Sequence, residues 1–413
     1  MHFNFSLYSS TLLIFFSQGI IFSFLLLKKA LVFSSKPSKW LSLFVFLCSI
    51  YLLPWMLGFA GWYSLQPYRD IMFYIPFQQL FLIGPAIYFY TQSLLNPSFT
   101  FKPKHWIHFL PSLAYMAYRV IIFVADKIVL HQYFFYANGR DKNLDTWYQI
   151  SGFISMFIYF LLCLRYYSIY KKIIYQTLSF ADSLLFSWIK KYLIAFLMMQ
   201  LLWLLFFLFY PGWGNFKEKW WYYLSFSSLL YYIGITGYAN NVKSLVSFQV
   251  SSIQKRVVYL LEENHPEIQT ENIVAIELNE VPKPAINPQL EEWKIKIMNA
   301  IAKDKLYQNP NLTLLDVARQ LDTNQTVISK MVNQGFQMNF NDFINDFRVK
   351  AVIALLEQGE HKTQTLLGIS IDCGFNSKTT FNRCFKKQTG VSPKIFIENI
   401  QKSNKPTPDN DIA

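Results

Sequence analysis

Long apolar runs, separated by short polar stretches, occupy the first 245 residues of the chain. A helix needs about 20 apolar residues to cross the hydrocarbon core of a bilayer. Runs of this kind predict seven membrane-spanning helices, at residues 6–27, 40–60, 71–94, 106–125, 148–164, 192–211 and 220–239. The first run is too long for the apolar part of a signal peptide, and Lys28 and Lys29 follow it rather than precede it. We therefore expect it to be a span that is not cleaved.

The pattern changes after residue 288, where apolar residues recur at helical spacing between charged ones. This spacing predicts helices at residues 289–306, 313–321, 325–334 and 340–357. Asn324 is suited to cap the start of the third of these helices, and Gly335 to cap its end. The small Ala318 would allow the second and third helices to cross closely, as in a helix-turn-helix motif.

A tether joins the two halves at residues 246–288. Apolar residues recur at steps of four and three in its first part, at Val246, Val250, Ile253, Val257 and Leu260. This spacing predicts a helix, which either pairs with a second copy as a short coiled coil or lies on the membrane or on the C-terminal domain. Residues 265–288 contain four prolines and several acids, which indicates a largely extended linker.

The C-terminal region repeats itself at a shift of 53 residues. The shift pairs apolar positions with each other and polar positions with each other: Ile328 with Phe381, Met331 with Cys384, Gln325 with Lys378, Thr326 with Thr379, Ser329 with Asn382, and Lys330 with Arg383. An internal repeat is far more specific than either half alone. It predicts two helix-turn-helix motifs joined by the long helix at 340–357.

Two stretches connect this repeat with a known family. The run CGFNSKTTFNRCFKKQTGVSP at 373–393 and the run FNDFINDFRV at 340–349 resemble the C-terminal DNA-binding domain of AraC/XylS-type transcription regulators. The resemblance extends over about residues 290–398, with Asp322 and Ser370 standing where the family usually has Gly and Ala. It implies that each motif places one recognition helix in the major groove, and that the two helices address successive grooves on one face of the DNA.

The candidate DNA-binding residues follow from the chemistry of base recognition. Side chains that read base edges are polar and lie on the outward face of a helix inserted in the groove. We expect such contacts from Gln325, Thr326, Ser329 and Lys330 in the first recognition helix, and from Lys378, Thr379, Asn382, Arg383, Lys386 and Lys387 in the second. Lys386 and Lys387 are better placed for phosphate, which positions the protein without specifying sequence. For any single residue the alternative is a solvated helix face.

The net charge of +13 belongs to the apolar half. Residues 1–245 hold 19 Lys and Arg against 6 Asp and Glu, whereas the rest of the chain holds 19 against 19. Alternate loops between the predicted spans hold 11 and 6 basic residues, and loops with more Lys and Arg usually face the cytoplasm. With seven spans this predicts an N-terminus outside the bacterial inner membrane and a C-terminal domain in the cytoplasm.

Few residues suggest ligand binding, metal binding or catalysis. Arg119 is the one charge deep in a predicted span, so it either extends to the membrane surface, makes a structural polar contact, or binds a ligand. The four cysteines are widely spaced, so neither a disulfide framework nor a metal site is expected. The sequence contains no HExxH, Walker A or GxGxxG motif. We expect no cofactor and no enzymatic activity.

These observations predict an all-α protein, a seven-helix membrane bundle followed by a cytoplasmic double helix-turn-helix domain. The expected domains are a membrane sensor (1–245), a helix and linker (246–288), a DNA-binding domain (289–400) and a disordered tail (401–413). The expected function is a membrane-bound, one-component transcription regulator that responds to a small-molecule or envelope signal. Its expected partners are promoter DNA, RNA polymerase and the lipid bilayer, with homodimerisation left open. The alternative is a membrane receptor or transporter whose tail binds protein.

Overall fold

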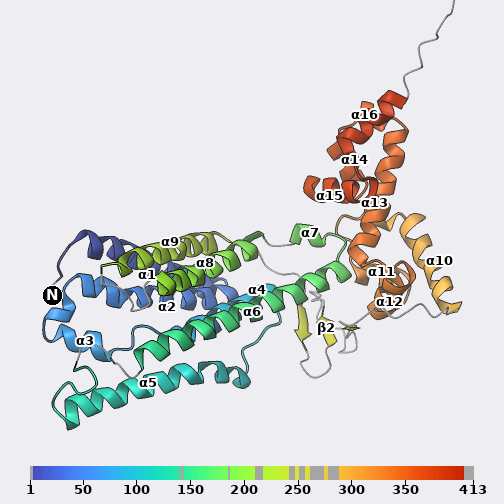
Figure 1. Cartoon of the computed structure of the whole chain (residues 1–413). Coiled ribbons are helices and arrows are strands. Elements are labelled where there is room, and N and C mark those ends of the chain that lie inside the picture. Colours follow the sequence, from blue (N-terminus) through green and yellow to red (C-terminus); the bar gives the residue numbers. More distant parts are fainter. Residues whose placement is uncertain are drawn as a thin grey trace, which may run out of the picture. The chain divides into compact units, whose positions relative to one another are not determined.

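The computed structural model divides into two compact units, residues 1–168 with 186–244 and residues 169–185 with 245–413 (Figure 1). The structure describes residues 3–137, 139, 141, 144–184, 187–209, 217–240, 247–250, 256–260, 274–277 and 288–403. The first unit is built from helices, and the second contains helices and a small sheet. One helix, α6 (Asp145–Thr177), begins in the first unit and ends in the second.

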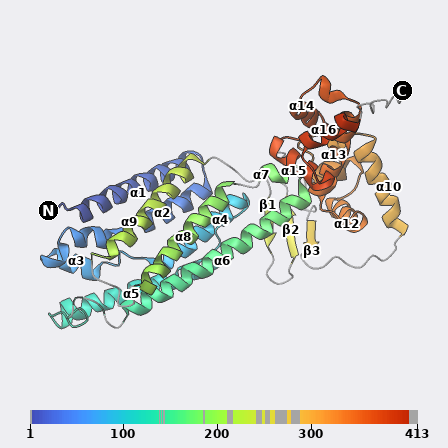
Figure 2. The same ribbon diagram turned by 45° about the horizontal axis from the view of Figure 1, so that its top comes forward.

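The first unit is a bundle of long helices. They are α1 (Leu7–Val32), α2 (Lys36–Phe59), α4 (Leu80–Leu95), α5 (Leu110–Phe123), α6, α8 (Ser187–Phe209) and α9 (Lys219–Ala239). Helices α1, α2 and α9 run side by side, as two views of the ribbon show (Figures 1 and 2). Helix α2 contacts α1, α4 and α9, and it carries buried side chains along its whole length. It therefore forms the centre of this bundle.

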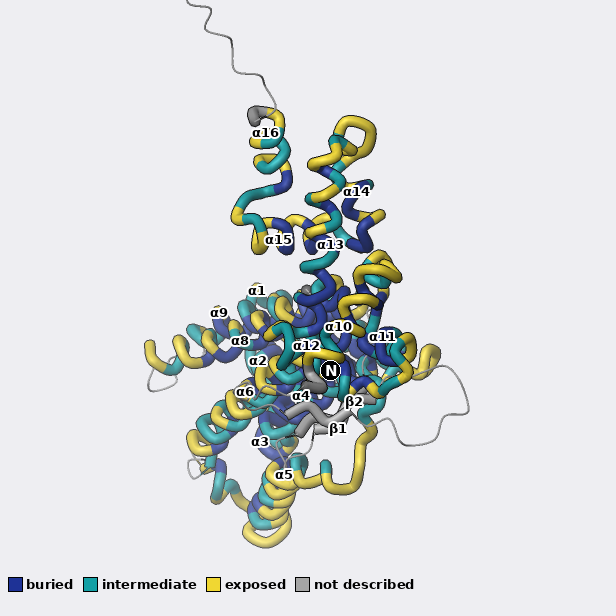
Figure 3. The backbone as a smooth tube through the Cα atoms, turned by 90° about the vertical axis from the view of Figure 1, so that its right-hand side faces the viewer, coloured by how far each residue is buried: buried dark blue, intermediate teal, exposed yellow. Residues whose placement is uncertain are grey.

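Five helical segments among the described residues are long and apolar enough to cross a membrane. They are Leu7–Val32, Lys36–Phe59, Pro103–Val129, Asp145–Thr177 and Trp188–Phe209. Helix α4 is apolar but shorter, and α9 coincides with the seventh predicted span without being among the five. The segment around α5 is the least buried of the five, as the exposed stretches of its tube in Figure 3 show. The count of seven spans stays a prediction.

The third predicted span is not one helix. Residues 71–94 fall in α3 (Tyr68–Tyr74) and α4, with an irregular stretch between them. Proline lacks an N–H group and disfavours helical backbone in the residue before it, and Pro76 follows Ile75, which is extended (φ −77°, ψ 123°). The Tyr148 hydroxyl accepts from the Leu80 amide at 3.0 Å and donates to the Gln78 carbonyl at 2.6 Å. A side chain of α6 thus provides hydrogen-bond partners for the backbone groups that the break between α3 and α4 leaves unpaired.

The second unit contains the predicted helices of the C-terminal region and one more, α16. The helices are α10 (Pro288–Ala302), α11 (Leu314–Gln320), α12 (Gln325–Gly335), α13 (Phe340–Glu357), α14 (Leu366–Asp372), α15 (Lys378–Thr389) and α16 (Pro393–Ser403). Two separate apolar cores hold them, one for α10 to α12 and one for α14 to α16, and α13 contributes to both. A short helix, α7 (Ala181–Leu184), also belongs to this unit.

The tether contains strands, among them β1 and β2 where the sequence predicted a helix. Strands β1 (Ser247–Val250), β2 (Arg256–Leu260) and β3 (Val274–Glu277) form an antiparallel sheet in the order β1-β2-β3. The helix prediction for 246–260 is therefore wrong at the described residues, and the all-α class needs this exception. Runs such as RVVYL and VAIE are rich in β-branched and aromatic residues, which favour strands. Val246 and Ile253 lie outside the described residues.

The C-terminal end differs slightly from the prediction. Helix α16 continues to Ser403, so the first three residues of the predicted disordered tail are helical. Residues 404–413 lie outside the described residues.

Candidate nucleic-acid interface

Each half of the C-terminal domain is a short helix, a tight turn and a capped second helix. The turn residues Asp322 (φ 49°) and Gly374 (φ 91°) adopt left-handed backbone conformations. The Asn324 side chain accepts from the Val327 amide at 2.9 Å, which confirms the predicted cap of α12. Ser377 caps α15 in the same way. Helix α15 begins 53 residues after α12, so the repeat in sequence is a repeat in structure.

The long helix α13 joins the two halves. Its 18 residues correspond to a length of about 27 Å. Phe340, Phe343 and Ile344 belong to the first core, whereas Val352 and Leu356 belong to the second. One continuous helix thus fixes the spacing of the two motifs.

Helix α15 presents an exposed basic face. The predicted contact residues of this helix are all exposed: Lys378, Thr379, Asn382, Arg383, Lys386 and Lys387. Phe381 and Phe385 on the opposite face are buried in the second core. Helix α15 contains no acidic residue, so its outward face combines positive charge with amide and hydroxyl groups. Such a face suits both phosphate and base edges.

Helix α12 differs from this pattern. Thr326 and Lys330 are exposed, but Gln325 is only 7% exposed and Ser329 only 6%. Gln325 and Ser329 are therefore not accessible in this structure, and their contact with DNA stays a prediction. Strand β3 of the tether lies against α12. Sequence reasoning missed this contact because it treated the tether as a helix and an extended linker.

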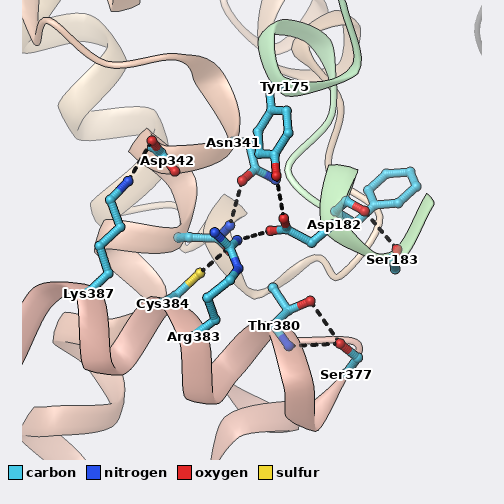
Figure 4. Close-up of polar contacts among 12 residues, drawn as sticks. Tyr175, Asp182, Ser183, Asn341, Asp342, Ser377, Thr380, Arg383, Cys384 and Lys387 are labelled. Carbon is cyan, nitrogen blue, oxygen red and sulfur yellow. Dashed lines mark hydrogen bonds and ion pairs between the residues drawn. The ribbon is translucent and has the colours of Figure 1, made fainter. Parts of the chain in front are cut away.

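Two basic residues of α15 are already paired with carboxylates. Arg383 forms an ion pair with Asp182, and Lys387 lies 2.8 Å from a carboxylate oxygen of Asp342 in the first turn of α13 (Figure 4). Asp182 is held from the other side by the Tyr175 hydroxyl, which donates to it at 2.6 Å. Asp182 lies 201 residues before Arg383 in the chain, and no local pattern could have indicated this pair.

Arg348 is a buried charge that the sequence reasoning did not assign a role. It lies in the middle of α13 and is only 1% exposed. Its guanidinium donates to the carbonyl oxygens of Tyr307, Asn309 and Ser179, and to the Ser179 hydroxyl. Burial lowers the pKa of Arg348 to about 10, so it stays charged at neutral pH. An arginine within the apolar stripe of a predicted helix was the available signal.

The cysteines of this domain are core residues. Cys373 and Cys384 are both buried. Burial raises the pKa of each thiol to about 11, so both are protonated near pH 7.

Arg119 lies in the first unit, on α5, and is only 8% exposed. Its guanidinium donates to the Tyr136 hydroxyl and the Phe73 carbonyl, while its Nε has no hydrogen-bond partner among the described residues. It borders a cavity of about 900 Å³ that aromatic and charged side chains line, among them Trp55, Arg69, Tyr115, Asp141 and Lys219. Arg119 thus makes structural polar contacts, and it also faces a space large enough for a small molecule.

Comparison with known proteins finds a family match for part of the second unit. A family model described as a helix-turn-helix domain matches residues 317–399, from within α11 to within α16. No curated protein matches the chain, and no solved structure matches it. The match extends over most of the first motif, the helix that joins the motifs, and the second motif. The chain therefore carries a helix-turn-helix domain of the AraC type, the DNA-binding part of a transcription regulator.

Proposed function

We propose that this chain is a membrane-embedded, one-component transcription regulator. The observation that carries the proposal is the presence, in one chain, of an AraC-type domain with an exposed basic recognition helix and of five helices long enough to span a bilayer. The DNA-binding domain would bind promoter DNA in the cytoplasm, and the helical bundle would receive the signal. RNA polymerase is the partner through which promoter occupancy would change transcription.

The geometry of the second unit supports binding to two successive major grooves. Major-groove sites on one face of B-DNA repeat about every 34 Å. Helix α13, about 27 Å long, places one motif at each end, and each motif ends in a capped recognition helix. Arg383 and Asn382 have the donors to read guanine and adenine edges, whereas Lys386 is suited to phosphate.

Two observations support the orientation with the DNA-binding domain in the cytoplasm. The predicted cytoplasmic loops hold 11 basic residues against 6 in the others. The loop after α6 is one of them, and its residues 178–182 contact the DNA-binding domain in the second unit. A loop and a domain in contact lie on the same side of the membrane.

The cavity beside Arg119 supports a sensing role for the bundle. Its aromatic walls suit an apolar body, and Arg119 with Lys219 suits an anionic group. We therefore propose an amphiphilic anion from outside the cell or from the bilayer as the signal. Arg69, Asp141 and Lys219 lie in or beside loops that the charge count places outside.

Chromatin capture of the full-length, tagged protein tests the proposal. We expect discrete promoter sites, and purified full-length protein in lipid nanodiscs should prefer these fragments over unrelated DNA. Asn382→Ala should weaken binding by about 1–3 kcal/mol on these fragments and relax the choice at one base pair. Lys296→Glu, on the exposed side of α10, is the control and should leave the preferred sequence unchanged. If chromatin capture finds no promoter sites and the purified protein prefers no DNA fragment, the proposal is contradicted.

A further inference from the structure

We propose that residues 177–182, the docking segment, compete with DNA for the second recognition helix. The inference rests on the proposed function and names a regulator of its DNA-binding site. The docking segment follows the last turn of α6, a candidate membrane helix, and it belongs to the same compact unit as the DNA-binding domain. In this structure it holds the domain in a form that excludes DNA.

The backbone of the docking segment is bonded to the domain at two places. The Ser179 amide donates to the Leu312 carbonyl at 3.1 Å, and Leu178 pairs with Thr313 as an antiparallel β-bridge. The Asn341 side chain, on α13, donates to the Leu178 carbonyl at 3.2 Å. The docking segment therefore contacts both the start of the first motif and the helix that joins the motifs.

The residues of the docking segment are buried, so the segment is packed within its unit and not merely hydrogen-bonded at its surface. The five residues before Asp182 are all buried. Ser179 provides two acceptors to Arg348, its carbonyl oxygen at 3.2 Å and its hydroxyl at 3.0 Å. Arg348 is a buried charge whose hydrogen bonds to the described residues all end on neutral oxygens, so each acceptor helps to stabilise that charge inside the domain. The docking segment is thus part of the structure that supports α13.

The end of the docking segment places a carboxylate on a residue expected to read bases. Asp182 pairs with Arg383, which projects from the exposed face of α15, while Tyr175 holds the other carboxylate oxygen (Figure 4). A guanidinium that pairs with Asp182 cannot at the same time form two hydrogen bonds with a guanine. The carboxylate would also repel the phosphates that approach this face. Binding of DNA to α15 therefore requires Asp182 to leave.

The first recognition helix also contacts another part of the chain. Strand β3 lies against α12, in which Gln325 and Ser329 are buried whereas Thr326 and Lys330 are exposed. The Gln325 Oε1 atom is buried with no hydrogen-bond partner among the described residues. Both recognition helices are thus engaged by other parts of the chain, which agrees with a form of the domain that does not bind DNA.

DNA affinity of the full-length protein in nanodiscs tests the docking segment. The probes are the promoter fragments captured in cells and an unrelated fragment of equal length. Asp182→Asn removes the charge but keeps the shape, and we expect it to bind the promoter fragments about tenfold more tightly than the wild type. The matched control is Asp346→Asn, which removes the charge from the half-buried partner of Lys350 on α13 and should leave the affinity unchanged. Equal affinity of Asp182→Asn and wild type on captured fragments overturns the inference.

A reversible lock provides a second test that does not depend on one charge. Directly opposed residues of an antiparallel pair have Cα atoms about 4.5–5.5 Å apart, which suits a disulfide. The double variant Leu178→Cys/Thr313→Cys should bind promoter DNA at least about tenfold more weakly when oxidised than when reduced. Unchanged affinity on oxidation overturns the inference. If instead no variant prefers any promoter fragment, the proposed function itself fails.

Discussion

A left-handed turn residue occurs in both helix-turn-helix motifs, but the two residues are of different types. Gly374 tolerates its φ of 91° because it lacks a Cβ, whereas Asp322 adopts a φ of 49° with a side chain. A Cβ on Gly374 would also collide with the Tyr307 carbonyl oxygen and approach Arg348 Nε to 3.0 Å. The two turns therefore respond differently to substitution, although each residue is the second after the end of the first helix of its motif.

We predict that Gly374→Ala destabilises the C-terminal domain by at least about 2 kcal/mol, because backbone strain and collision add. Asp322→Gly should instead stabilise it by up to about 1 kcal/mol, because it relieves the left-handed strain. Thermal unfolding of the full-length protein, monitored by the susceptibility of its C-terminal domain to proteolysis, measures both changes in stability. Equal effects of the two substitutions would contradict this account of the turns.

Single residues were predictable where their roles depend on neighbours in sequence. Asn324 was predictable as a cap because capping depends on residues within one helical turn. The partner of Arg383 was not predictable, since Asp182 reaches it only through the fold. The burial of Gln325 and Ser329 was missed for the same reason, since helical periodicity does not show what packs on the outward face.

At the scale of elements, α13 was predictable to the residue. Its apolar stripe is long, and Asn339 caps its start by accepting from the Asp342 amide at 2.9 Å. The break between α3 and α4 was missed because apolar composition hides a helix end inside a long run, even with Pro76 present. The tether was missed because a spacing of four and three over only two heptads is a weak signal beside the strand preference of Val, Ile and Tyr.

The continuity of α13 has a measurable consequence. Lys350 lies near the middle of this helix, is exposed, and pairs with Asp346. We predict that Lys350→Gly weakens binding to a two-groove promoter about fivefold relative to Lys350→Ala, because glycine costs about 1 kcal/mol of helix stability. Both variants lose the same charge, so their ratio reports the helix alone. Affinities of the full-length proteins for one promoter fragment give this ratio, and a ratio near one would contradict a rigid connector.

At the scale of the whole molecule, the charge count predicts which parts face outward. Phe134 is exposed and lies in a predicted outer loop, whereas Lys303 is exposed at the end of α10. A membrane-impermeant maleimide should label Phe134→Cys in intact spheroplasts and Lys303→Cys only after lysis. The four native cysteines are buried, so the wild type is the background control. Labelling of Lys303→Cys in intact spheroplasts would contradict the orientation.

One helix connects the proposed signal site with the docking segment. Asp145, Thr146 and Gln149 border the cavity at the start of α6, and Thr177 ends the helix where the docking segment begins. A ligand could bind the cavity more tightly in one position of α6 than in another. It would then shift the equilibrium between the bound and released docking segment by the difference between its two binding free energies.

This order of events predicts how two substitutions combine. Arg119→Ala should keep promoter occupancy low in all growth conditions, because the signal no longer acts on α6, whereas Asp182→Asn should keep it high. The double variant should behave like Asp182→Asn, since release of the docking segment follows signal binding. Chromatin capture of the three variants and the wild type, across conditions in which wild-type occupancy varies, measures this. Low promoter occupancy of the double variant would mean that Arg119 acts after release of the docking segment. In that case α6 would not carry the signal from the cavity to the docking segment.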